Sequence, residues 1–311
     1  MLNRRKAIQL LSASAAAFVI PTPNIFAQAN ESESASASFT YCLNMATIRG
    51  HKLGFIKELE VAAKGGFRSV EIWIDSLQQY LDSGGTVKEA ANKMKALGIT
   101  AENAIGFAKW IVDDETVRSQ AIEQLKKEMD LLAAIGCKRI AAPPMGATDA
   151  TSFDLLEAAR RYRIILELGD KSGVVPHLEV WGFSRTLSKA SEAMLVAMEA
   201  GHPSAKILLD VYHLYKGGSS VETLPMIGKS TVELIHMNDY PAIDRTKITD
   251  GDRVHPGDGI APIKTILNAL KKPNQPLILS EEVFNKKYYE QDPVEVVKTA
   301  MAKMKAAVSG L

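Results

Sequence analysis

The sequence predicts an α/β protein folded as a single (β/α)8 TIM barrel. Short apolar runs typical of strands alternate with amphipathic helical patterns, and the alternation has a period of roughly 30 residues, the length of one strand–helix unit. Eight such runs occur, each followed by a helical pattern, which fits a closed barrel better than an open sheet. No G-x-G-x-x-G motif follows the first run, so a dinucleotide-binding sheet has little support.

The expected strands are short apolar runs bounded by glycine-containing or polar segments. They span residues 39–46, 69–74, 99–104, 138–144, 174–181, 205–212, 232–239 and 276–284. The expected helices follow them with an amphipathic periodicity, which is weakest in the sixth. They span residues 53–66, 87–98, 115–136, 153–173, 188–201, 220–228, 262–272 and 293–308.

The first 29 residues are typical of a signal peptide. A basic start with the pair Arg4-Arg5, similar to a twin-arginine signal, precedes an apolar stretch shorter than the ~20 residues of a membrane span. An A-x-A cleavage pattern follows at 27–29. We expect export to the periplasm without stable membrane insertion after cleavage; an uncleaved anchor and a Sec signal are the alternatives. Residues 30–38 are expected to be a disordered linker, and 39–311 the barrel.

The composition is that of an ordinary globular domain. The chain is 46% hydrophobic and 23% charged with a formal net charge of +1, which argues against a nucleic-acid-binding protein. Its cysteines, Cys42 and Cys137, lie in apolar segments and are expected to be buried thiols rather than a disulfide framework or a zinc cluster.

A carboxylate inside an apolar run points to a metal site. Glu179 lies in the strand-like stretch VVPHLEVWG, where an isolated charge costs several kcal/mol unless it is paired or metal-bound. The next strands carry Asp210, His236 and the pair Glu281-Glu282 near their C-terminal ends, where barrel enzymes place catalytic residues. Each acid alone could instead cap a helix or form an ion pair. Together they form a hard donor set suited to Mn²⁺ or Mg²⁺, with Zn²⁺ and Co²⁺ as alternatives.

The segments LEVWGF, LLDVYHLYKG, ELIHMND, PGDGIAPIKTIL and LSEEVFN resemble the xylose-isomerase-like TIM barrel superfamily of sugar isomerases and epimerases. The resemblance covers essentially all of residues 39–311, and ketose 3-epimerases and hydroxypyruvate isomerase are the nearest functional models. It implies one divalent metal ion held by Glu179, Asp210, His236 and Glu282. Adjacent strand residues face opposite ways, and the family's Glu-apolar-apolar-Asn pattern matches Glu282, so Glu281 is the alternative ligand.

The resemblance also implies substrate contacts. The histidine of the family's Asp-x-x-His corresponds to His213, and a substrate-holding arginine corresponds to Arg253. The alternatives are a solvated loop histidine and a surface ion pair. Asp252 and His255 share the loop of Arg253 and are weaker candidates. The preceding segment, 240–252, is longer than in compact epimerases, and we expect a lid or a contact within a homo-oligomer.

Apolar walls are expected for the pocket. Trp110 and Trp181, with Trp73, are predicted to pack against a sugar ring or else to be core residues. His177 shares the strand face of Glu179 and is expected either to support the substrate site or to be a hydrogen-bonded core histidine.

The implied activity is a metal-dependent sugar isomerase or epimerase. Glu179 and Glu282 would act as base and acid on the carbon next to a carbonyl, through an enediolate. The alternative is a metal-dependent lyase or dehydratase acting on a keto-sugar, an inosose or a 3-keto-glycoside. A DNA-repair nuclease of this fold is disfavoured, since its extra histidines after the second and third strands are absent from the sequence. A non-catalytic sugar-binding protein is a further class. The expected partner is a small-molecule sugar or keto-sugar, and no nucleic acid.

Overall fold

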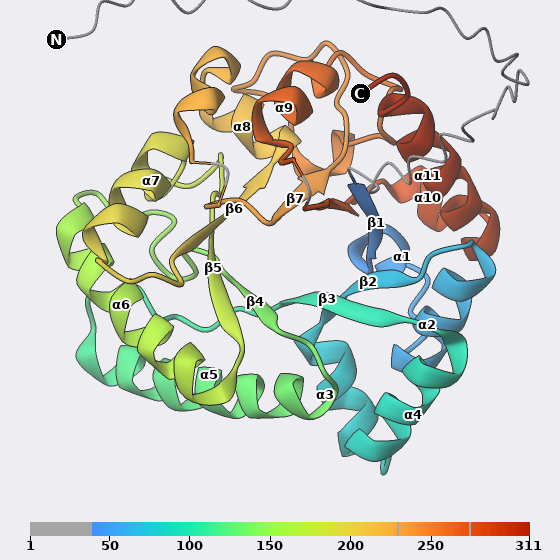
Figure 1. The fold of residues 1–311 in the computed structure, drawn as a ribbon, viewed down its shortest axis with the longest axis horizontal. Coiled ribbons are helices and arrows are strands. Elements are labelled where there is room, and N and C mark those ends of the chain that lie inside the picture. Colours follow the sequence, from blue (N-terminus) through green and yellow to red (C-terminus); the bar gives the residue numbers. More distant parts are fainter. Residues whose placement is uncertain (1–38, 229, 274) are drawn as a thin grey trace, which may run out of the picture. The chain divides into compact units, whose positions relative to one another are not determined.

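Eight parallel strands form a nearly closed barrel in the order β3-β2-β1-β8-β7-β6-β5-β4 (Figure 1). The structure, a computed structural model, describes residues 39–228, 230–273 and 275–311. The strands are β1 (Phe39–Asn44), β2 (Ser69–Trp73), β3 (Thr100–Ile105), β4 (Arg139–Ala142), β5 (Val175–Glu179), β6 (Lys206–Asp210), β7 (Leu234–Met237) and β8 (Leu277–Glu281). Because β3 and β4, the ends of this order, also pack against each other, the predicted single (β/α)8 barrel is confirmed.

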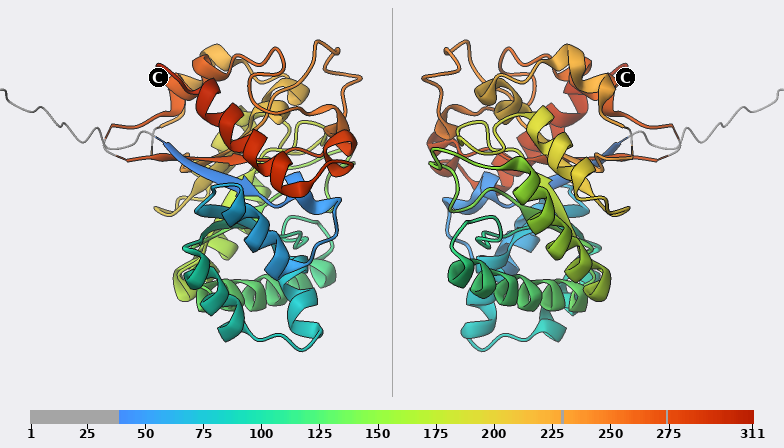
Figure 2. Two further views of the ribbon diagram at one scale, coloured as in Figure 1. Left: turned by 90° about the vertical axis from the view of Figure 1, so that its right-hand side faces the viewer. Right: turned by 90° about the vertical axis from the view of Figure 1, so that its left-hand side faces the viewer.

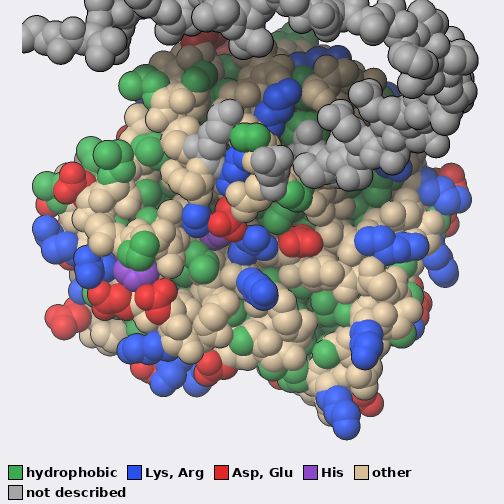
Figure 3. Space-filling view, in the orientation of Figure 1, with side chains coloured by type: hydrophobic (Ala, Val, Ile, Leu, Met, Phe, Trp, Pro, Cys, Tyr) green, Lys and Arg blue, Asp and Glu red, His purple; other side chains and the backbone are tan. Residues whose placement is uncertain are grey.

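Helices surround the strands on the outside of the barrel (Figures 1 and 2). They are α1 (Ala46–Arg49), α2 (Phe55–Lys64), α3 (Ile74–Asp82), α4 (Val87–Leu97), α5 (Glu115–Ala134), α6 (Leu155–Ser172), α7 (Ala190–Glu199), α8 (Val211–Gly217), α9 (Ile263–Leu270), α10 (Lys286–Tyr289) and α11 (Pro293–Ala307), with 3-10 turns η1 (Val221–Met226) and η2 (Asp250–Asp252). On the face in Figure 3, acidic and basic side chains are interspersed.

Two helices, α3 and α8, were not predicted from the sequence. α3 starts directly after β2, so two helices rather than one connect β2 to β3. The expected strand 205–212 is too long, because α8 begins at Val211. The side chain of Asp210 accepts a hydrogen bond from the His213 backbone N–H at 2.8 Å, and such an N-cap starts a helix at once. Gly218, at φ 72°, ends α8, and only the short turn η1 follows where a helix over 220–228 was expected.

Side chains alternate between two environments along each strand. Residues such as Leu178, Leu209 and Ile235 are buried outside the barrel wall against the helices, and burial of each such side chain contributes roughly 1.5–3 kcal/mol. Their neighbours point inward, where polar groups form hydrogen bonds across the barrel, as between His236 on β7 and Glu71 on β2. The apolar shell therefore fixes strands whose interior is polar.

Both cysteines are buried and free, as expected. The predicted signal peptide, 1–29, and linker, 30–38, lie outside the described residues and stay predictions. Among the helices that the structure describes, none is long and apolar enough to cross a membrane.

Candidate metal centre and active site

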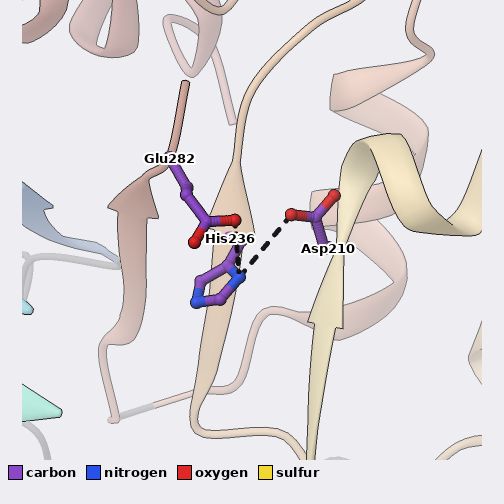
Figure 4. Close-up of side chains that lie close together, drawn as sticks. All are labelled: Asp210, His236 and Glu282. Atoms are coloured by element: carbon purple, nitrogen blue, oxygen red, sulfur yellow. Dashed lines mark ion pairs between the residues drawn. The ribbon is translucent and has the colours of Figure 1, made fainter. Parts of the chain in front are cut away.

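Four side chains from consecutive strands converge at the C-terminal end of the barrel. Glu179 ends β5, Asp210 ends β6, His236 lies on β7 and Glu282 directly follows β8. The Nδ1 atom of His236 lies 3.3 Å from Glu282 Oε2, 3.5 Å from Asp210 Oδ2 and 3.7 Å from Glu179 Oε1. Figure 4 shows Asp210 and Glu282 on either side of the His236 ring. The structure thus brings Asp210, His236 and Glu282 together, whereas Glu179 lies 3.7 Å from His236 but outside the group in which every ligand atom is within 4.8 Å of the others.

The spacing of these atoms suits ligands that share one ion. Donor atoms about 2.1 Å from a divalent cation lie about 3.0 to 3.4 Å from one another at octahedral or tetrahedral angles. One ligand atom each of Asp210, His236 and Glu282 lies within 4.8 Å of the others. Although His236 is fully buried, its Nδ1 atom has no hydrogen-bond partner among the described residues. Such an atom costs about 1–3 kcal/mol, so a buried ring nitrogen facing three carboxyl groups fits the donor set of a divalent cation.

Carboxyl groups outnumber basic groups around the Nδ1 atom of His236. Burial, opposed by His236 and reinforced by Glu282, raises the pKa of Glu179 to about 8. Burial is the largest influence on Asp210 and would raise its pKa, but the Arg253 guanidinium, 3.0 Å away, together with His213 and His236 outweighs it and holds the pKa of that carboxyl below its usual value. For His236, burial alone would lower the pKa, yet the neighbouring carboxylates of Glu282 and Glu71 raise it well above the ordinary value. Such an excess of carboxylates favours a cation.

Arg253 and His213 are part of the same buried cluster. The guanidinium Nη1 donates to Asp210 Oδ2 at 3.0 Å and to Glu282 Oε2 at 2.7 Å, and Nη2 lies 3.2 Å from His213 Nε2. Arg253 is 1% exposed and its guanidinium lies 4.4 Å from the centre of the Tyr212 ring. Burial lowers the pKa of His213 to about 4, so its imidazole is neutral at pH 7. Neither residue matches the solvated alternatives that the sequence left open.

The adjacent acids at the C-terminal end of β8 face different surroundings. Glu282 faces His236, whereas Glu281 is bonded to His255, whose Nδ1 lies 2.6 Å from Glu281 Oε1. The geometry therefore agrees with the choice of Glu282 as the candidate ligand. His255 belongs to this separate pair, and Asp252 accepts hydrogen bonds from Thr249 at the start of η2.

A cavity of about 310 Å³ lies over the cluster. Its walls are five aromatic rings, of Trp73, Phe107, Trp181, Phe183 and Phe284. The neighbouring ring centres are 5.3–6.3 Å apart. The remaining lining residues are Ile105, Glu179, His213, Asp250, Arg253 and Glu282. Apolar walls with a few convergent polar groups are typical of a small-molecule site. A larger hollow of about 820 Å³ between α3 and α5 shares Ile105 and Phe107 with the cavity but reaches no candidate metal ligand.

Two residues predicted to bind substrate lie elsewhere. Trp110 donates its indole N–H to the Pro143 carbonyl at 3.0 Å and packs on Tyr162, with ring centres 5.9 Å apart. His177, two residues before Glu179 on the same strand, is fully buried. Neither ring nitrogen of His177 has a hydrogen-bond partner in the described part of the chain, and burial lowers its pKa to about 3. Neither residue lines the cavity. Both match the core alternatives, except that His177 lacks the expected hydrogen bond.

Sequence reasoning missed the support behind the cluster. Glu71 of β2 accepts a hydrogen bond from the Nε2 atom of His236 at 3.1 Å, on the opposite side of the ring from Nδ1. It is fully buried, and its signal was a lone carboxylate in the apolar run SVEIWI, the same signal that singled out Glu179. The cavity aromatics Phe107, Phe183 and Phe284 were missed as well. They lie outside the strands, where no periodicity marks them.

Comparison with known proteins agrees with this architecture. The family model for the xylose isomerase-like TIM barrel matches residues 59–307. An inosose isomerase from Halalkalibacterium halodurans is 27% identical over 272 residues, which cover 83% of this chain and 93% of that protein. A crystal structure of the IOLI protein with a zinc atom bound has a TM-score of 0.81 at 23% identity, over 87% of this chain and 98% of that chain. The structure of L-ribulose 3-epimerase has a TM-score of 0.70 at 16% identity, over 87% of this chain and 94% of that chain.

The last two similarities establish the fold alone. The isomerase relatives and the matched family together support the expected isomerase or epimerase enzyme. Because the family model covers most of the chain, the protein belongs to the xylose isomerase-like TIM barrel family.

Proposed function

We propose that the chain is a divalent-metal-dependent isomerase or epimerase of a cyclic keto-polyol, of which an inosose is the model. One observation carries the proposal: the unpartnered Nδ1 atom of His236 faces oxygens of Glu179, Asp210 and Glu282 at 3.3–3.7 Å, beside a cavity with aromatic walls. The relatives named inosose isomerase support the substrate class. A six-membered carbon ring also suits these walls, since its C–H faces pack on aromatic rings.

Glu179 and Glu282 are the proposed proton carriers, because both line the cavity. One carboxylate takes the C–H proton next to the carbonyl, and the electron pair of that bond moves toward the carbonyl oxygen, which gives an enediolate. The other acid returns a proton. Return to the opposite face of the same carbon gives epimerisation. Return to the neighbouring carbon, with a proton shift between the two oxygens, gives isomerisation.

The proposed ion is held by Glu179, Asp210, His236 and Glu282, and would act as a Lewis acid toward the negative charge that develops on oxygen. We favour Mn²⁺ or Mg²⁺, because three of the four donors are carboxylates. Zn²⁺, which the IOLI structure contains, and Co²⁺ are the alternatives. Metal analysis of the purified protein distinguishes these ions.

Two polar side chains of the cavity wall suit substrate oxygens. His213 and Arg253 both line the cavity. We assign them to substrate hydroxyl or carbonyl groups. Such contacts would hold the reacting carbon beside Glu179 and Glu282.

Proton exchange measured by NMR tests the proposal. The purified protein is incubated in D₂O with an inosose and, in parallel, with a panel of ketoses and 3-keto-glycosides. We expect deuterium at the carbon next to the carbonyl of a converted substrate, loss of exchange after metal removal with a chelator, and recovery on adding Mn²⁺ or Mg²⁺. Exchange that persists after exhaustive metal removal would refute the mechanism. New signals of an unsaturated ketone would indicate the lyase or dehydratase activity instead.

Export to the periplasm is part of the same proposal. It rests on Arg4-Arg5, the apolar stretch and the A-x-A pattern of residues 1–29. Cell fractionation of the full-length protein, compared with a variant in which both arginines are replaced by lysine, tests it. Equal amounts of both proteins in the periplasm would exclude the twin-arginine route.

A further inference from the structure

Glu71 is a buried carboxylate that lies behind the candidate metal centre. It sits on β2, across the barrel from the candidate ligands of β5 to β8, and is fully buried. An ionised carboxylate in such a place must be satisfied by donors, because its desolvation costs several kcal/mol.

Donors from four other strands meet the two oxygens of Glu71. Its Oε1 atom accepts from Asn103 Nδ2 at 2.6 Å and from His236 Nε2 at 3.1 Å. Its Oε2 atom accepts from Asn44 Nδ2 at 2.9 Å and from Ser280 Oγ at 2.5 Å. These bonds fix the carboxylate in position and orientation, so it is a rigid acceptor for the imidazole.

The contact with His236 decides which ring nitrogen is free. A carboxylate only accepts hydrogen bonds, so the Nε2 atom that faces Glu71 must carry the proton. In a neutral imidazole the lone pair is then on Nδ1, the atom that faces Glu179, Asp210 and Glu282. Glu71 therefore sets the tautomer as well as the tilt of the ring.

A second connection runs from Glu71 to Glu282. The amide nitrogen of Asn44 donates both to Glu71 Oε2 at 2.9 Å and to Glu282 Oε1 at 3.1 Å. This leaves Glu282 Oε2 on the side of His236 Nδ1, 3.3 Å away. One carboxylate on β2 thus orients two candidate ligands on β7 and β8.

We propose that Glu71 is the positioning residue of the metal centre: it presents His236 Nδ1, and through Asn44 the Glu282 carboxylate, to a divalent cation. This inference rests on the proposed function, because it requires a metal ion at the cluster. It assigns Glu71 no contact with the substrate, since Glu71 does not line the cavity. Partners of this kind typically change metal affinity 10–100-fold when they are replaced.

The test measures metal affinity rather than turnover alone. Mn²⁺ is titrated into the metal-free protein and the free ion is followed by electron paramagnetic resonance, for the wild type, Glu71→Gln and Glu71→Asp. Glutamine keeps the shape but loses the charge, and aspartate keeps the charge but is one methylene too short to reach His236. We expect each variant to bind Mn²⁺ 10–100-fold more weakly and to change the visible absorption spectrum of bound Co²⁺, which reports ligand geometry.

Glu58→Gln is the matched control. Glu58 of α2 is also a buried carboxylate that accepts a hydroxyl hydrogen bond, from Ser76 at 2.8 Å, but it has no contact with the cluster. We expect it to lose stability without changing the Mn²⁺ affinity or the Co²⁺ spectrum. Glu71 variants that bind Mn²⁺ within twofold of the wild type would overturn the inference while leaving the proposed function intact. A wild-type protein that binds no divalent metal would overturn both.

Discussion

Replacement of His177 by leucine should weaken the pH dependence of stability. The imidazole is fully buried, and neither nitrogen has a hydrogen-bond partner in the residues that the structure describes. Burial is the largest cause that lowers its pKa to about 3; the charge of Glu233 opposes this shift and the charge of Arg139 adds to it. In the unfolded chain the same histidine titrates near its ordinary pKa of about 6.5.

The sign follows from which state binds the proton. Above pH 6.5 the imidazole is neutral in both states and adds no pH dependence. Below that pH the unfolded chain is protonated while the folded protein is not, so stability falls as the pH falls, until the folded pKa of about 3 is reached. One proton changes the unfolding free energy by about 1.4 kcal/mol per pH unit. Between pH 7 and pH 5 this amounts to about 2 kcal/mol.

Urea unfolding measures the effect. The unfolding free energies of the wild type and His177→Leu are compared at pH 7 and pH 5, with chelator present so that metal binding does not contribute. Contributions of other groups cancel in the difference between the two proteins. We expect the variant to lose about 2 kcal/mol less than the wild type on going to pH 5. Equal losses in both proteins would refute the assignment of His177 as a buried neutral histidine without a partner.

Further predictions concern the candidate site. Glu282→Gln should lower kcat/KM about 10²–10⁴-fold. Glu281→Gln should change kcat/KM less than about tenfold, but should lower the unfolding free energy by about 1–3 kcal/mol because it weakens the hydrogen bond with His255. Steady-state kinetics and urea unfolding distinguish the two effects. Trp181→Ala removes a cavity wall and should raise KM up to about tenfold with a smaller change in kcat. A saturating divalent ion should raise the Tm of the wild type but not that of Asp210→Asn, as read by thermal unfolding; equal shifts would place the ion elsewhere.

The barrel was predictable because its cause is local. Apolar runs of strand length, each followed by a helical period, repeat eight times through the chain, and a closed parallel sheet surrounded by helices buries the outer faces of all eight strands. The ends of elements were less predictable. Val211 and Tyr212 continue the apolar run of β6, and a single side-chain bond from Asp210 decides that they are helical. That bond depends on where the Asp210 side chain turns, which the sequence pattern does not specify.

The candidate ligands were predictable for a related reason. Parallel strands bring their C-terminal ends to one side of the barrel, so acids and a histidine at the ends of consecutive strands must meet. The position of Trp110 could not be predicted in this way. It follows β3, yet its indole packs against Tyr162 of α6 and does not line the cavity. Loops carry no periodicity that indicates their direction, so the aromatic walls required the structure.

Glu71 could have been identified from the sequence by the same physical reasoning that identified Glu179. Polar side chains inside a barrel need hydrogen-bond partners. A carboxylate within an apolar strand therefore requires hydrogen-bond donors, whichever strand carries it. Its donors come from β1, β3, β7 and β8, strands far apart in the sequence. Two of the candidate ligands, on β7 and directly after β8, are therefore held from behind by groups of β1 to β3. Substitution of a candidate ligand on β5 to β8 should remove that ligand from the site. Substitution of a supporting residue on β1 to β3 should leave the ligand set intact and change its affinity for the ion.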